Sequence, residues 1–159
     1  MDQFDMLGKW FWVVFIVVTF ANAAIFKFRS IKQVKVNPDL SEGYSKVIKG
    51  FVLWCNIPLL IMGLGCTIGG VPSVFHYFNP KSCNPYILAF FGSIFLIWCL
   101  GTYWLLFRDG AEILVKHPGM FNFDFKNPTM VKLFWFACLA GGILGVVMMF
   151  TQDIPMPNI

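Results

Sequence analysis

The sequence predicts an all-α integral membrane protein, a single domain of residues 1–159 that forms a bundle of four transmembrane helices. Only 13% of its residues are charged, whereas a soluble domain typically has about 25%. Four stretches contain no Asp, Glu, Lys, Arg or His: residues 10–26, 50–72, 86–107 and 133–151. Each is close to the roughly 20 residues that cross a bilayer core as a helix. A soluble helical bundle would instead show polar faces at helical period, which these stretches lack.

The first apolar stretch, residues 10–26, is expected to be a retained helix. Residues 21–23 read Ala-Asn-Ala, which resembles the site at which a signal peptide is cleaved. A secretory signal, however, has its basic residues before the apolar core. Here the basic cluster follows the core, at Lys27, Arg29, Lys32 and Lys35.

Asn-Pro pairs predict where helices begin, because Asn is a favoured N-cap and Pro is favoured at the first helical position. The third and fourth spans should open at the pairs in positions 84–85 and 127–128. The pair at 37–38 should open a helical lead-in, through residues 41–49, to the second span.

The third span is expected to continue beyond the membrane as a solvated helix. Arg108, Glu112 and Lys116 are spaced four residues apart, so their side chains would pair along one helix face. Together with residues 41–49, this segment would form short amphipathic extensions on the cytoplasmic side.

The distribution of basic residues predicts the orientation of the chain. Ten of its twelve Lys and Arg residues lie in two of the three connections and their flanks: Lys27, Arg29, Lys32, Lys35, Lys46, Lys49, Arg108, Lys116, Lys126 and Lys132. Short basic loops remain in the cytoplasm. Both termini are therefore expected outside, in a multi-pass protein of a bacterial inner (plasma) membrane.

The five cysteines form no C-x-x-C pair, which argues against a thioredoxin-like redox centre. In the predicted topology Cys83 lies in the outer loop and Cys66 lies near the outer end of the second span. A disulfide between them is one interpretation, since the exterior is oxidising. The alternative is that all five cysteines are small apolar packing residues.

Two amides, Asn22 and Asn56, interrupt the apolar surface of the first and second spans. The predicted topology places them at similar depth. One interpretation is an interhelical hydrogen bond between them that stabilises the packing of the two helices. The alternative is that the two amides bind a substrate.

The densest polar cluster lies at the inner end of the third span: Arg108, Asp109, Glu112 and His117. Its acidic residues, together with Asp124, would hold a cation if they gathered in space. A salt-bridged helix end is the alternative. His76 and His117 are expected on opposite sides of the membrane, and no span contains a His, so no haem, other cofactor or metal site is predicted.

Glycines at four-residue spacing predict close helix packing. They are Gly65 and Gly69 in the second span, and Gly141 and Gly145 in the fourth. Packing inside the chain and packing against another subunit both remain open at this stage.

These features favour a non-enzymatic structural or assembly subunit, or a lipid-contacting one. The expected partners are membrane lipids, a second copy or a larger membrane protein, and no nucleic acid. The spans lack the ionisable group that ion-coupled carriers use, and no nucleophile with a nearby base is present. Two alternatives remain: a small oligomeric transporter or channel lined by Asn22 and Asn56, and an inner-face lipid-modifying enzyme that uses Asp109, Glu112 and His117.

The predicted orientation is testable with a topology reporter. A reporter enzyme that works only outside the cytoplasm should be active when it is fused after Ile159. The reason is that the basic loops keep the opposite end of the helices in the cytoplasm. Activity of a cytoplasm-specific reporter at the same position would reverse the orientation. A fusion after Asp39, within the basic connection, is the matched control and should give the opposite pattern.

Overall fold

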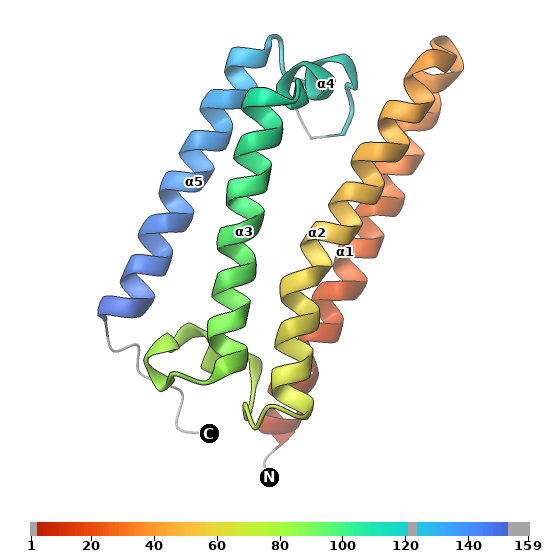
Figure 1. The fold of residues 1–159 in the computed structure, drawn as a ribbon. Coiled ribbons are helices and arrows are strands. Elements are labelled where there is room, and N and C mark those ends of the chain that lie inside the picture. Colours follow the sequence, from red (N-terminus) through yellow and green to blue (C-terminus); the bar gives the residue numbers. More distant parts are fainter. Residues whose placement is uncertain (1–2, 121–123, 153–159) are drawn as a thin grey trace.

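The computed structural model describes residues 3–120 and 124–152. Within this part the chain is helical and contains no strand. The long helices are α1 (Gln3–Val36), α2 (Ser41–Thr67), α3 (Pro85–Phe107) and α5 (Pro128–Thr151), and α4 (Gly110–Lys116) is short (Figure 1). Three 3-10 turns complete the order: η1 (Pro38–Leu40), η2 (Val74–Phe78) and η3 (Pro80–Ser82).

All four long helices are long and apolar enough to cross a membrane. This confirms the predicted all-α fold with four transmembrane helices. The start of α1 and the end of α5 lie at the same end of the molecule, and the connection between α1 and α2 lies at the other (Figure 1).

The first two helices extend well past the predicted spans. α1 has 34 residues, which at 1.5 Å per residue is about 51 Å, against a bilayer core of about 30 Å. The connection between the first two spans, residues 27–49, is therefore mostly helical. The predicted helical lead-in is the start of α2 at Ser41, whereas the continuation of α1 to Val36 was not predicted. An uncharged stretch therefore indicates the part of a helix that crosses the bilayer, and the helix can extend beyond that stretch.

The Asn-Pro pairs open helices as predicted. The side chain of Asn84 accepts a hydrogen bond from the backbone N–H of Tyr86 at 2.9 Å. Asn127 does the same for the N–H of Met130 at 2.9 Å. Asn37 caps η1, which leads directly into α2.

Two expectations about helix ends are wrong. The second helix ends at Thr67 and not at residue 72, because Gly70 adopts a left-handed φ of 68° and the chain then turns away. The third helix does not continue through Lys116. It ends at Phe107, Asp109 takes a left-handed φ of 52°, and α4 begins as a separate helix.

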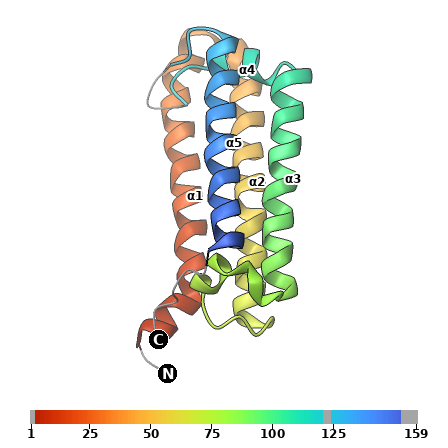
Figure 2. The same cartoon turned by 90° about the vertical axis from the view of Figure 1, so that its left-hand side faces the viewer.

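The long helices form two hairpins, α1–α2 and α3–α5. α2 and α3 approach each other near the end that holds η2 and η3, and they diverge toward the other end, where α4 lies between them (Figure 1). Figure 2 shows α1 and α3 on opposite sides of the molecule. The arrangement is an open array in which neighbours along the chain pack together.

The buried core is divided between the two ends of the array. One cluster, near η2, joins the first hairpin to α3: Met62, Cys66, Val71, Val74, Tyr77 and Ile87. The other joins α3, α4 and α5 at the opposite end: Leu105, Ala111 and Val131. The two hairpins are thus connected mainly through their ends.

Within the first hairpin, the least exposed positions of α1 recur at alternating spacings of four and three: residues 12, 16, 19, 23, 26 and 30. This is the period of a coiled-coil seam. Phe26 packs edge-on against Phe51 of α2, with ring centroids 5.2 Å apart. Further along, Trp12 covers Gly63, where an added Cβ would lie 2.8 Å from the indole ring.

Replacing Gly63 by Ala should destabilise the first hairpin. The new methyl group would force Trp12 to move, and overpacking of this kind typically costs about 1–3 kcal/mol. Thermal unfolding in detergent should show a lower Tm. Gly50→Ala is the matched control on the same helix, because the nearest atom there, Cδ1 of Trp54, is 3.9 Å away. Equal Tm values for the two variants would contradict the proposed packing role of Gly63.

Candidate functional site

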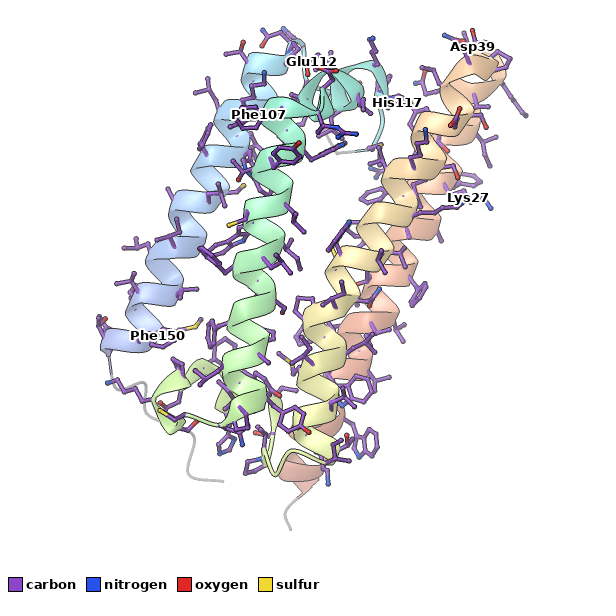
Figure 3. The ribbon with its side chains drawn as sticks, in the orientation of Figure 1. Lys27, Asp39, Phe107, Glu112, His117 and Phe150 are labelled. Carbon is purple, nitrogen blue, oxygen red and sulfur yellow. The ribbon has the colours of Figure 1, made fainter. Side chains whose placement is uncertain are left out.

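The end of the molecule that carries α4 is basic. Ten Lys and Arg residues and five Asp and Glu residues belong to it, which gives a net charge of 10 − 5 = +5. The rest of the sequence holds two basic residues, Lys9 and Lys81, and three acidic residues, a net charge of 2 − 3 = −1. Asp39, Glu112 and His117 all lie at the end that carries α4, called here the basic end (Figure 3).

His117 lies just after α4 and is buried, with 7% of its surface exposed. Its Nδ1 donates a hydrogen bond to the carbonyl oxygen of Ile113 at 2.6 Å. The other edge of the ring faces α2, where Nε2 lies directly against Gly43. The imidazole also contacts Tyr44 edge to face, with centroids 4.7 Å apart and planes at 86°.

A hydrogen bond completes this contact between the two halves of the molecule. The hydroxyl of Tyr44, which is itself 2% exposed, donates to the carbonyl oxygen of Pro118 at 2.6 Å. His117, Tyr44, Gly43 and Pro118 are called here the basic-end contact. They tie the first hairpin to the segment after α4 at the end where α2 and α3 diverge.

The other residues of the predicted polar cluster are not gathered around His117. Glu112 forms an ion pair with Lys132 of α5 at 3.7 Å, and not with Arg108 or Lys116 as predicted. Arg108 and Asp109 are exposed at the break between α3 and α4. His117 faces α2, so the three groups proposed for an inner-face enzyme do not converge on one point.

No cation site forms from the predicted carboxylates. In residues 3–120 and 124–152, no group of three or more His, Cys, Asp and Glu side chains is placed to hold a metal ion. Asp124 instead accepts a hydrogen bond from the backbone N–H of Gly119 at 2.8 Å. This bond stabilises the turn after the basic-end contact.

Asn22 and Asn56 do not pair. Asn22 is exposed on α1, whereas Asn56 is 8% exposed. The Nδ2 of Asn56 donates to the carbonyl oxygen of Val52 in its own helix at 2.7 Å. Its Oδ1 is buried without a hydrogen-bond partner in the described part of the chain. The interhelical bond between the two amides is therefore absent from this structure.

Cys66 and Cys83, the predicted disulfide, are free thiols in the structure. Cys66 is 3% exposed within the core near η2, and Cys83 is exposed in the connection that follows η3. Cys66 thus has the packing role that was the alternative interpretation.

The two glycine pairs differ in what covers them. Gly65 packs against the hydroxyl of Tyr77, and both Gly65 and Gly69 pack against Tyr86. This pair therefore serves contacts inside the chain. An added Cβ at Gly141 or Gly145 would meet no atom within 4 Å in the part of the chain that the structure describes.

Sequence reasoning missed a groove between α3 and α5. It has a volume of about 630 Å³, and its lining includes Phe95, Cys99 and Phe107 of α3 with Leu139 and Ile143 of α5. The only hint in the sequence is that Phe95, Cys99 and Thr102 recur at helical spacing. Only the tertiary structure shows that α5 faces these residues.

The chain matches no known family model, and no curated protein or solved structure is significantly similar to it.

Replacing Gly43 by Ala should loosen the basic-end contact, because the methyl group would occupy the position of the His117 ring. Spin labels at the exposed positions 46 and 116 would report the separation of α2 from α4 by pulsed electron resonance. We expect a longer and broader distance distribution than in the unmutated chain. Ser45→Ala, on an exposed neighbour, is the control. Identical distributions in both variants would show that His117 does not hold the two halves together.

Proposed function

We infer that this chain is a non-catalytic subunit of a membrane assembly, and that α5 supplies the surface on which a neighbouring helix packs. The neighbour is a second copy of the chain or a helix of a larger membrane protein. The observation that carries this proposal is the open face at Gly141 and Gly145, where an added Cβ would meet no atom of the described residues within 4 Å.

The contrast with Gly142 supports this reading. Gly142 lies between the two on the sequence, and there an added Cβ would lie 2.6 Å from the indole of Trp98. α5 thus uses one glycine for a contact inside the chain and leaves two at four-residue spacing unoccupied. A glycine in a helix costs about 1 kcal/mol relative to Ala. At Gly141 and Gly145 no packing contact within the described chain offsets this cost.

The chemistry of membranes favours a helix as the partner of this face. Apolar side chains gain nothing from leaving lipid for a protein surface, so helices in bilayers associate where small residues allow close backbone contact. An apolar segment of 18 residues in α5 has no residue buried within the chain. α5 is therefore the long helix with most surface left for such a contact.

Replacing Gly141 by Leu should weaken association without harming the fold. The chain should unfold at the same temperature, because the new side chain points into open space, while the associated chain should dissociate at least about tenfold more readily. Mass measurement of the complex purified in mild detergent would detect this loss. Co-purification of a stoichiometric protein, or a dimer mass, is the expected state of the unmutated chain.

Gly142→Leu is the matched control. It should lower Tm, because Leu would displace Trp98 from α5. A monomeric, partner-free unmutated chain, or association that survives Gly141→Leu, would contradict the proposal.

A further inference from the structure

The groove between α3 and α5 lies within the membrane-crossing part of both helices. Its volume of about 630 Å³ falls in the range of small-molecule sites in proteins, about 300–1,000 Å³. It extends along α3 from Phe95 to Phe107. Phe107, the last of these residues, lies at the basic end (Figure 3), so the α3 side of the groove reaches that end.

The hydroxyl of Thr102, which lies in the lining of the groove, is not free to bind an occupant. The hydroxyl of Thr102 donates to the carbonyl oxygen of Trp98 at 2.7 Å and accepts from Nε1 of Trp135 at 2.9 Å. Its hydrogen-bonding capacity is thus met by α3 and α5 themselves. An apolar chain is the occupant that such a surface suits, since a polar one would be left without partners.

The mouth of the groove has a different character. Tyr103 and Phe107 stack there with ring centroids 5.7 Å apart. Arg108 follows directly and is exposed, and Lys132 of α5 is one-third exposed beside Glu112. Aromatic rings next to basic side chains are typical of the headgroup level of a membrane. The net charge of +5 at this end favours an anionic headgroup.

A helix is a poorer occupant for this groove. Helix interfaces in membranes are enriched in small residues, whereas this groove is lined by Phe95, Trp98 and Leu139. The small-residue face of α5 lies elsewhere, because Gly141 is two residues from both Leu139 and Ile143 and therefore points about 160° away from each around the helix axis.

We propose that the α3–α5 groove is a binding site for one anionic phospholipid, with an acyl chain between the helices and the phosphate at Arg108 and Lys132. The lipid is retained at a defined position and is distinct from the exchanging lipid around the protein. It fills the space that α3 and α5 leave between them. This inference does not depend on association through α5, and the two have separate readouts.

The test uses the full chain, delipidated in mild detergent and titrated with phosphatidylglycerol or with phosphatidylcholine of the same acyl chains. Native mass spectrometry should show one phosphatidylglycerol retained per chain in preference to phosphatidylcholine. Cys99→Trp fills the groove and should reduce retention of both lipids at least about tenfold. Cys55→Trp, at an exposed cysteine of α2, is the control and should bind as the unmutated chain does.

Arg108→Gln changes the mouth and leaves the lining intact. It should lower the preference for phosphatidylglycerol over phosphatidylcholine about fivefold, as expected for one basic residue at an anionic surface, and leave phosphatidylcholine binding unchanged. This variant decides the question if Cys99→Trp does not fold.

Three results would overturn the proposal. They are equal retention of the two lipids by the unmutated chain, lipid binding by Cys99→Trp equal to that of Cys55→Trp, and an oxidative cross-link between Cys99 residues of two copies. The last result would place a second copy in the groove.

Discussion

The structure depends on one kind of contact, in which an aromatic ring packs directly against a glycine. Trp12 of α1 covers Gly63 of α2, and Tyr86 of α3 covers Gly69, just after the end of α2. The same contact recurs between α3 and α5, between α3 and α4, and between α2 and the end of α4: Trp98 on Gly142, Trp135 on Gly101, Trp104 on Gly110 and His117 on Gly43. In lipid the hydrophobic effect does not draw helices together, so shape complementarity of this kind must hold them.

This interaction explains why the helices form an open array. Each ring joins only two elements, and most of the rings lie near η2 or at the basic end, where the two core clusters lie. Between these ends, most side chains of the long helices face outward. The buried cluster near η2 joins the first hairpin to α3 at one end of the molecule. The basic-end contact has the corresponding role at the other end, because it joins α2 to the segment after α4 where the helices have diverged (Figure 1).

The two proposals use opposite kinds of unfilled surface. At Gly141 and Gly145 the side chains are small and the surface suits a helix backbone, whereas the α3–α5 groove is lined by bulky apolar side chains that extend to Phe107. A subunit that packs on a neighbour through one side of α5 and holds an anionic lipid on another would stand at a boundary between protein and lipid. Neither role needs an ionisable group within a span, and the charge-free spans of this chain have none.

The sequence by itself determined that four charge-free stretches cross a membrane, that Asn-Pro pairs begin helices, and that one end is basic. These properties follow from local composition and capping, because a bilayer forces each crossing segment to satisfy its own backbone. It did not determine that Glu112 pairs with Lys132, that His117 meets Gly43, or that Asn22 and Asn56 lie apart. Nor did it distinguish Gly65, which a tyrosine covers, from Gly141, which no described residue covers. Those outcomes depend on how each helix is rotated about its axis, and in apolar helices the sequence carries little periodic signal for rotation, so only tertiary packing decided them.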